Sequence, residues 1–347
     1  MEKLRVNNTP VRTSRNFLIN NLEVELEIPQ KDEFINLKII NEKSNIDNNV
    51  SNKPLTYGMG KILEELNYET ANNKIRIQTS NKKENIQIIY EFDDNNINLI
   101  NQIEIIANGN TNVTIVYKSK TSKKCFHNGI IRTTVKENAQ LNVTIINLLN
   151  EESDNLEAIE NQLEKNSTTN YTIIDIGAKT SVSNYYSNII GENAKNDLKS
   201  IYLGINNQKK DLNYIAELKG ERTNIEIDVQ GALKDSAKKN FKGTIDFKKG
   251  CKKAKGNENE YCMLLSNKAK SIALPMLLCT EEDVEGNHST ASGKVDEKQL
   301  FYIMTRGFSY KEAVKLIVKS KFNKIIDRIS DKNLKDEIIN EIDKRLD

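Results

Sequence analysis

Short stretches in which apolar and polar residues alternate fill the middle of the chain, from about residue 73 to residue 265. Such period-two alternation, bounded by Asn, Gly, Asp or Lys residues, predicts β-strands. The stretches lie at residues 75–79, 86–90, 97–100, 103–106, 113–117, 130–135, 141–146, 171–176, 201–203, 225–229 and 244–247. So many short strands, with almost no helical interruption, indicate either a β-sandwich or a coiled parallel solenoid.

The turns between these stretches favour the solenoid. A small residue repeatedly follows polar ones just before a new strand, as at Ala139, Ala194 and Ala269, which suits the corners of a β-helix. The strands are also short and similar in length, and stacking them turn upon turn would bury a continuous apolar interior. No strict repeat length can be counted, and residues 151–168 predict a helical excursion or a flexible loop between the strands.

The first 72 residues have a mixed pattern. Residues 22–28 alternate like a strand until Pro29, and the sequence around them is typical of an arm or linker. Residues 54–72 place four apolar side chains on one helical face, which predicts one short helix. These side chains are Met59, Ile62, Leu63 and Leu66.

After Gly293 the pattern becomes helical. Asp296 can cap a first helix that ends at Gly307, while Ser309 and Glu312 form a capping box that begins a second one. The second helix continues to about residue 330, and residues 331–346 form a third amphipathic segment. We therefore divide the chain into an N-terminal arm and helical region (1–72), a β-helix core (73–293) and a C-terminal helical domain (294–347).

Composition and charge limit the possible partners. The chain has 347 residues, with 51 Lys and Arg against 49 Asp and Glu, and the two signs are interspersed. Nucleic acid is therefore not an expected partner. The N-terminus has no apolar segment of signal-peptide length and no membrane-spanning run occurs, so we expect a cytoplasmic protein without a membrane partner. The glycosylation patterns at Asn112, Asn142 and Asn166 are then chance matches.

The cysteines and histidines offer few candidate sites. Cys125, Cys251, Cys262 and Cys279 show no C-x-x-C spacing and are expected to be free, buried thiols. Cys125-Phe126-His127 brings a thiol and an imidazole to one side of a strand, but no third ligand or orienting carboxylate accompanies them. Cys279 precedes His288 by nine residues and could approach it across adjacent turns.

His288 lies in the dense stretch 283–313, "DVEGNHSTASGKVDEKQLFYIMTRGFSYKEA". From the residues alone, a structural histidine hydrogen-bonded at a junction between strand and helix is the simpler interpretation, since no second ligand stands at a recognisable spacing. Ser292-Gly293-Lys294 does not complete a G-x-x-x-x-G-K-[ST] phosphate loop, because His288 and Val295 occupy two of its fixed positions. Any ATPase activity must therefore belong to another subunit.

The segment 288–318 resembles the C-terminal signature of the SufB/SufD family of iron-sulfur cluster assembly proteins. The family pattern is a histidine-centred turn followed by G-[KR]-[IL]-[DG]-E-x-x-LFY-x-x-x-RG-[IF]-S-x-x-x-A. The matching residues are Gly293, Lys294, Glu297, Leu300, Phe301, Tyr302, Arg306, Gly307, Ser309 and Ala313. Upstream, residues 241–245 are similar to the F-x-G-x-I strand of the family, and residues 263–269 with Pro275 are similar to its LLLS-x-x-A and T-x-P elements.

Within this family, two departures favour the SufD pattern over the SufB pattern. The SufB pattern has a cysteine where this chain has Ala269, and a glutamate where it has Ser289. The SufD pattern keeps a histidine at the position of His288, usually within C-S-H-G-A-T, whereas residues 286–291 read G-N-H-S-T-A here. The segment 286–291 therefore departs from the SufD pattern by lacking its Cys before the histidine and its Gly after it.

The resemblance implies a mainly β fold with some α, in which a right-handed parallel β-helix lies between an N-terminal region and a C-terminal helical domain. It also implies a non-enzymatic, SufD-like scaffold subunit, with His288 at the interface with SufB as a candidate metal ligand. No stably bound cofactor is expected, only a transient iron-sulfur cluster between subunits. The partner would be a SufB-like paralogue or a second copy of this chain.

A SufC-like ABC ATPase would dock on the helical region through Phe301, Tyr302, Arg306, Gly307, Ser309, Glu312 and Ala313. ATP-driven dimerisation of that ATPase would then move the helical domains and rearrange the β-helices. Packing of the helices on the body of the chain explains their apolar residues equally well. Two alternatives remain: a SufB-like scaffold that itself carries a cluster, and a polysaccharide-active β-helix enzyme, which should show clustered acids and a secretion signal that are not visible.

Overall fold

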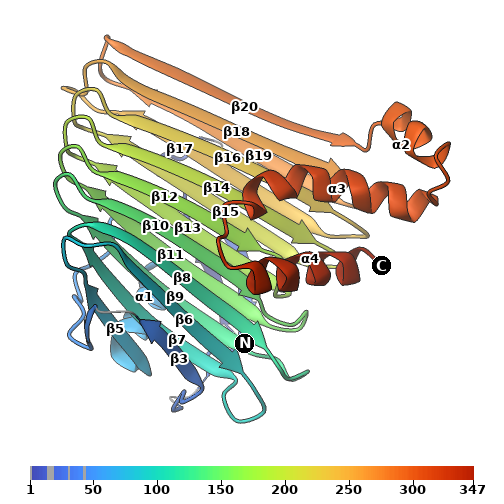
Figure 1. The fold of residues 1–347 in the computed structure, drawn as a ribbon, viewed down its shortest axis with the longest axis horizontal. Coiled ribbons are helices and arrows are strands. Elements are labelled where there is room, and N and C mark those ends of the chain that lie inside the picture. The colour runs from blue at the N-terminus through green and yellow to red at the C-terminus, as the bar shows by residue number, and fades with distance from the viewer. Residues whose placement is uncertain (1, 14–18, 30–31, 42–43) are drawn as a thin grey trace.

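The computed structural model describes residues 2–13, 19–29, 32–41 and 44–347. The chain forms a parallel β-solenoid of about eight turns, built from two facing nine-stranded sheets (Figure 1). Sheet I contains β3 (Leu37–Asn41), β6 (Glu84–Phe92), β8 (Asn110–Ser119), β10 (Gln140–Leu148), β12 (Thr168–Asp175), β14 (Lys195–Gly204), β16 (Asn224–Leu233), β18 (Ala254–Leu264) and β20 (Val284–Lys294). Sheet II contains β4 (Asn45–Asp47), β5 (Asn73–Gln78), β7 (Asn98–Ala107), β9 (Phe126–Val135), β11 (Asp154–Leu163), β13 (Thr180–Ile189), β15 (Lys209–Leu218), β17 (Lys238–Phe247) and β19 (Lys270–Cys279).

The predicted solenoid is confirmed, and all eleven predicted strand stretches fall on strands of these two sheets. The stretches 97–100 and 103–106, read as separate strands, lie on the single strand β7. Neighbouring turns stack in register, so that equivalent side chains form columns. In one inner column, Ile75, Ile103, Ile131, Ile159 and Tyr185 follow one another through sheet II. These columns build the continuous apolar interior.

The corners explain the small residues seen in the sequence. Asn138 and Asn193 adopt left-handed backbone conformations with φ of 62° and 59°, which asparagine tolerates better than most residues. The alanines that follow them, Ala139 and Ala194, turn inward and are buried. The turns therefore point the next strand back along the stack.

The prediction of a helical excursion or a flexible loop at residues 151–168 was wrong. The segment forms β11 and the start of β12 rather than a helix or a loop. Period-two hydrophobicity is hidden in β11 because polar residues, including Asn155 and Glu157, occupy inner positions and are buried. Leu156 and Ala158 face outward, where the N-terminal segment covers them.

The N-terminal region lies over the outer face of sheet II. β1 (Glu2–Val6) and β2 (Leu22–Leu26) form an antiparallel pair, and α1 (Lys61–Thr70) confirms the predicted short helix. Asn67 on α1 donates from its side-chain nitrogen to the backbone oxygens of Asn101 and Asn128, at 3.1 and 2.9 Å. The predicted strand at 22–28 is thus observed as β2, and the arm is packed on the solenoid.

Three helices follow the last strand: α2 (Glu297–Met304), α3 (Tyr310–Ile326) and α4 (Lys332–Leu346). α3 and α4 lie against the outer face of sheet I, whereas α2 extends beyond the sheet and has no buried residue (Figure 1). Within the described residues, no helix is long and apolar enough to cross a membrane.

The two ends of the stack differ. At the N-terminal end, β3 and β4 pair antiparallel with β6 and β5 and so close the parallel stack with a reversed strand on each sheet. At the C-terminal end, β19 and β20 are the last strands of their sheets, and the chain leaves for the helices without adding another turn. We call the surface formed by β19 and β20 the open end.

Candidate functional site at the open end

His288 lies in the middle of β20, so the sequence-based placement at a turn or strand-to-helix junction was wrong. It pairs in register with Glu258 of β18, one turn below. Gly286 lies two residues earlier on the same face of β20, and a Cβ atom built there would face the side chains of Phe247 and Leu277. His288 therefore lies on the inner face of the last turn, and it is exposed because no further turn covers it.

The turn below His288 carries two buried carboxyl groups. Glu260 is paired: its Oε1 lies 2.7 Å from Nζ of Lys239 and accepts a 2.7 Å hydrogen bond from the hydroxyl of Tyr202. Glu258 is only 1 % exposed, and neither of its carboxyl oxygens has a hydrogen-bond partner among the described residues. Burial, together with the charge of Glu260, raises the pKa of Glu258 to about 8.

Gly243 makes the room for the Glu258 side chain. It continues the inner column of sheet II that holds Tyr185 and Tyr214 in the turns below. A Cβ atom at Gly243 would collide with the carboxyl group of Glu258. The absence of a side chain at one position of an otherwise bulky column thus admits a carboxyl group from the opposite sheet.

The cysteines do not join this site. Cys279 is exposed at the end of β19, where its thiol donates to the backbone oxygen of Glu281 at 2.9 Å. It stacks on Phe247, whereas the carboxyl group of Glu258 lies against Gly243, four residues earlier on β17. Cys251 and Cys262 are buried, and burial raises the pKa of the Cys251 thiol to about 11.

The Cys125-Phe126-His127 stretch is structural. His127 is fully buried, with its two ring nitrogens 2.6 Å from Asn155 Oδ1 and 2.9 Å from Asn101 Oδ1. Burial lowers the pKa of His127 to about 4, so the ring is neutral at physiological pH. Cys125 is buried, and its sulfur accepts from the side chain of Ser119 at 3.8 Å. No cluster of three or more possible metal ligands occurs within the described part of the chain.

Several residues assigned to ATPase docking shape the turn between α2 and α3. Gly307 has a φ of 95°, which favours glycine, and it ends the turn after α2. Ser309 and Glu312 form the predicted capping box at the start of α3. Ala313 is fully buried. The Arg306 guanidinium lies over the Tyr302 ring at 4.9 Å. These residues therefore shape the end of α2, the turn after it and the start of α3.

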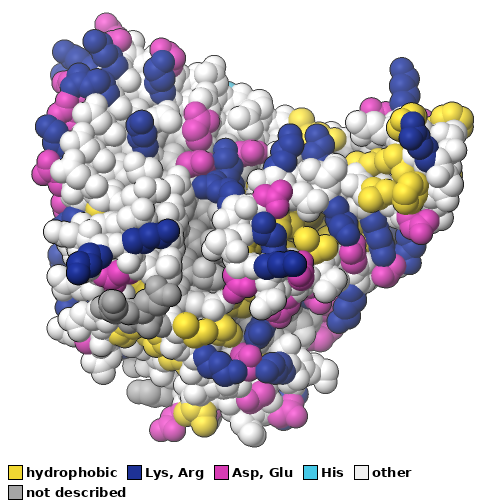
Figure 2. All heavy atoms as spheres, in the orientation of Figure 1, with side chains coloured by type: hydrophobic (Ala, Val, Ile, Leu, Met, Phe, Trp, Pro, Cys, Tyr) yellow, Lys and Arg dark blue, Asp and Glu magenta, His cyan; other side chains and the backbone are white. Residues whose placement is uncertain are grey.

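The helical hairpin formed by α2, its turn and the start of α3 displays an apolar surface, which we call the hairpin patch. Its side chains are exposed by 41 to 70 %, and they are Phe301, Tyr302, Met304, Phe308, Tyr310 and Leu316. Figure 2 shows hydrophobic side chains gathered over α2 and its turn, at the right-hand end of that face. A contiguous exposed apolar patch on a protein surface is typical of a binding site.

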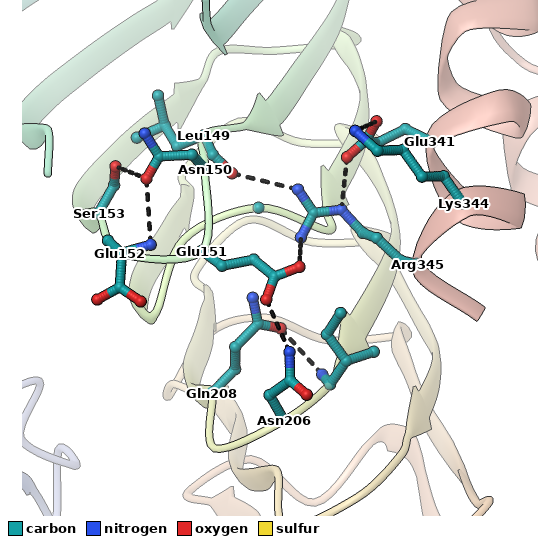
Figure 3. A network of polar contacts seen from close by, with 12 residues as sticks. Leu149, Asn150, Glu151, Glu152, Ser153, Asn206, Gln208, Glu341, Lys344 and Arg345 are labelled. Carbon is teal, nitrogen blue, oxygen red and sulfur yellow. Dashed lines mark hydrogen bonds and ion pairs between the residues drawn. The ribbon is translucent and has the colours of Figure 1, made fainter. Parts of the chain in front are cut away.

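α4 anchors the helices to the solenoid corners through Arg345, which is 7 % exposed (Figure 3). Its Nε donates to Glu341 Oε1 at 2.9 Å and its Nη2 donates to the backbone oxygen of Leu149 at 3.3 Å. Glu151 lies 4.0 Å from Nη1 and accepts from the Asn206 side chain at 2.7 Å. The guanidinium thus ties the C-terminal helix to the corner between β10 and β11, and Glu151 links that corner to Asn206 at a second corner.

Nothing in the sequence pattern singled out Glu258 and Glu260. Both occupy inner positions of β18, where Gly256, Glu258, Glu260 and Cys262 alternate with outward residues. The usual signal of an inner face is a row of apolar side chains. Two acids in that row concealed the strand, and only the register with His288 brings them together.

Comparison with known proteins identifies the family. Residues 90–321, from β6 into α3, match the model of the SufBD core domain of the SUF system for iron-sulfur cluster assembly. The iron-sulfur cluster assembly protein SufD of Bacillus subtilis is 25 % identical over 268 residues, which cover 75 % of this chain and 61 % of that protein. A SufBD family protein of Pyrococcus horikoshii is 28 % identical over 223 residues, covering 62 % of this chain and 49 % of that protein.

A SufBD family protein of Staphylococcus saprophyticus is 24 % identical over 236 residues, covering 67 % of this chain and 51 % of that protein. The chain thus spans between about half and three fifths of the length of these relatives. The matched core includes the whole open end, the hairpin patch and the solenoid from β6 onward. The chain belongs to the SufBD family of iron-sulfur cluster assembly proteins.

Proposed function

We propose that this chain is a SufD-like, non-catalytic scaffold subunit of a SUF complex, and that it pairs through the open end with a SufB-like paralogue or with a second copy of itself. The observation that carries the proposal is the open end itself: both sheets stop at unpaired strands, and His288 is exposed between them. Edge strands present unpaired N–H and C=O groups that readily bind another strand.

The contrast with the other end supports this assignment. There, β3 and β4 already cover the first parallel strands. Pro275 lies on β19, where a residue without an N–H group is tolerated because the strand is at an edge. A partner that adds strands to β19 and β20 would complete both sheets and enclose the polar groups of the last turn.

His288 would contribute to cluster assembly at that interface. A neutral imidazole is a suitable ligand for iron, and an exposed ring can also exchange protons with solvent. The iron and sulfide are cargo in this proposal, held transiently between subunits rather than bound as a resident cofactor. The free thiols of the chain fit a reducing compartment, and we place the complex in the cytoplasm.

The hairpin patch would bind a SufC-like ABC ATPase. The chain has no phosphate loop of its own, so ATP must be hydrolysed by another subunit. Phe301 and Tyr302 offer aromatic side chains of the kind that dominate binding energy at interfaces. Gly307, Ser309 and Glu312 hold the patch in shape, and the buried Ala313 makes no direct contact.

Co-expression with the SufB-like and SufC-like proteins of the same genome tests the proposal. A tagged form of this chain should retain both partners at low salt, as judged by size-exclusion chromatography with mass measurement. A Thr290→Pro change would remove a backbone N–H near the middle of β20 and should release the paralogue while the ATPase stays bound. Failure to retain the ATPase would contradict the assignment, and so would a chain that binds neither the paralogue nor a second copy of itself. A stable iron-sulfur cluster reconstituted on the isolated chain would also contradict it, because it would indicate a SufB-like scaffold.

A further inference from the structure

Glu258 is an anomaly in the interior of this protein. Buried polar groups are almost always hydrogen-bonded, and each exception needs an explanation. Both carboxyl oxygens of Glu258 lack a hydrogen-bond partner at 1 % exposure, whereas the neighbouring Glu260 keeps Lys239 and Tyr202 as partners of its Oε1 and leaves only its Oε2 without one. A carboxyl group of no use at this position could be replaced by an apolar side chain at a gain in stability.

The surroundings of Glu258 show that the fold makes space for it. Gly243 interrupts a column of large side chains at the point where the carboxyl group lies. Only one turn of the solenoid, that of β19 and β20, separates Glu258 from solvent at the open end. The group is thus buried at the bottom of the surface that we propose as the partner interface.

The register places His288 directly over Glu258. The two residues are partners on adjacent parallel strands, and both belong to the inner face. Adjacent strands lie about 4.8 Å apart, a separation that lets an imidazole nitrogen and a carboxylate oxygen reach one ion, given metal–ligand distances of about 2.0–2.2 Å. No third His, Cys, Asp or Glu joins them within the described residues.

We propose that Glu258 and His288 form a two-donor site for a divalent first-row transition ion, with Fe²⁺ as the cargo ion and water in the remaining positions until the partner is bound. The inference rests on the proposed function for the identity of the ion. One imidazole nitrogen and one carboxylate oxygen are a donor set that Fe²⁺ accepts. The ion would displace the proton of the buried carboxyl group to solvent and supply the partner that its oxygens lack.

The role of Glu258 in this site is separate from the role of His288 alone. A lone exposed imidazole would bind Fe²⁺ weakly and with no dependence on the residue beneath it. A site that uses both donors should lose affinity when either is removed, by about tenfold or more, as observed when a group that supports a metal site is lost. The dependence on Glu258 is therefore the distinguishing feature.

The test is anaerobic titration of the isolated full-length chain with Fe²⁺, followed by calorimetry, and with Co²⁺, followed by its visible absorption. The variants are Glu258→Gln, His288→Ala and the control Glu285→Gln. The control makes the same Glu-to-Gln change on the outer face of β20, where the carboxylate of Glu285 is exposed and pairs with Lys255 at 2.9 Å. We expect one saturable site in the native chain and in E285Q, with at least tenfold weaker binding in E258Q and H288A.

Binding to E258Q that equals binding to the native chain would overturn the inference, and so would the absence of a saturable site in the native chain. Circular dichroism and thermal unfolding check the fold of each variant. If E258Q does not fold, Glu258→Met removes the oxygens at similar volume and is judged by the same criterion. Retention of the SufB-like and SufC-like partners is measured separately. If the native chain binds both partners but shows no saturable metal site, the site is refuted and the proposed function stands.

Discussion

Replacing Phe301 by alanine should weaken ATPase binding far more than it weakens the fold. Phe301 lies on α2, which has no buried residue, and its side chain is 70 % exposed. Its ring therefore contributes little to the packing of the helices on sheet I. If the hairpin patch is a docking surface, the same ring should become buried when the ATPase binds.

The exposed fraction sets the size of the effect. An aromatic side chain buries about 200 Å² when fully covered, so roughly 140 Å² of Phe301 is free for a partner. At about 25 cal/mol per Å² this corresponds to about 3.5 kcal/mol for complete burial. Because alanine keeps the Cβ atom, the expected loss is about 2–3 kcal/mol, a roughly 30- to 150-fold rise in Kd. The area already buried limits the loss of folding stability to about 1.5 kcal/mol.

Calorimetry with the purified SufC-like ATPase measures the change, and urea unfolding measures stability. Ile35→Ala is the matched control, because Ile35 is an apolar residue exposed by 78 % in the N-terminal region, far from the hairpin in sequence and outside the patch. The control should bind like the native chain. Equal Kd values for the native chain and F301A would refute the docking role of the hairpin patch, whatever the stability of the variant.

Three further changes test the interior and the helical anchor. Arg345→Met should cost about 2–3 kcal/mol of unfolding free energy because it removes two charge-assisted hydrogen bonds, to Glu341 and to the Leu149 carbonyl, although that carbonyl keeps the N–H of Ala178 at 3.1 Å. Lys344→Met, at a side chain that is 79 % exposed, should stay within about 0.5 kcal/mol. In the native chain, Nζ of Lys210 lies 2.8 Å from the buried carboxylate of Asp175. Lys210→Met should cost about 3–5 kcal/mol of unfolding free energy because it leaves that carboxylate without its cation. Adding Asp175→Asn should recover most of the loss in a double-mutant cycle. Burial raises the pKa of Glu157 from 4.5 to about 8, so the folded state keeps a proton that the unfolded state releases, and this group makes stability fall by up to about 1.4 kcal/mol per unit as pH rises from about 5 to 8. Glu157→Gln should remove that dependence, and pH slopes that match those of the native chain in urea unfolding would show that Glu157 is ionised in the fold.

Strands with an apolar inner face could be predicted well from the sequence, because apolar alternation is a local property. Residues 113–117 and 141–146 alternate cleanly, and both lie on strands of sheet I as expected. The capping box at Ser309 and the stop at Gly307 are also local and were found where the pattern placed them. Elements whose inner face is apolar could therefore be recognised without knowledge of their neighbours.

The repeat length was present in the sequence but was interpreted as something else. The Asn-x-Thr matches at Asn112 and Asn142 were treated as chance glycosylation patterns. In the structure, the Asn142 side chain donates to Asn112, 30 positions before it, and Asn170 donates to Asn142, 28 positions before it. The motif recurs because equivalent positions of successive turns form an asparagine ladder on the outer face of sheet I.

The site could not be predicted in the same way, because it depends on register between distant strands. His288 and Glu258 are 30 positions apart, and nothing local marks them as neighbours. β11 and β18 were missed for a related reason: buried acids and amides at inner positions, such as Glu157 and Glu260, imitate exposed sequence. Polar residues in a solenoid interior are satisfied, or left free, only by what the adjacent turns provide.

The packing of α3 and α4 limits how an ATPase could act on the open end. Ten apolar side chains of these helices and the turn between them are buried in the cluster on sheet I. At about 1.5 kcal/mol each, exposing them would cost roughly 15 kcal/mol, which equals or exceeds the total stability of an ordinary domain, about 5–15 kcal/mol. The two helices must therefore stay docked while the protein works. α2 has no fully buried residue, and only its half-buried Leu300 and Ile303 pack against this cluster. A turn containing Gly307 joins it to α3, so α2 is held to the solenoid much more weakly than α3 and α4. A force applied at Phe301 and Tyr302, the α2 part of the hairpin patch, would first reorient α2. It would reach β20 through the two residues between Lys294 and Glu297 rather than through a swing of the helical domain.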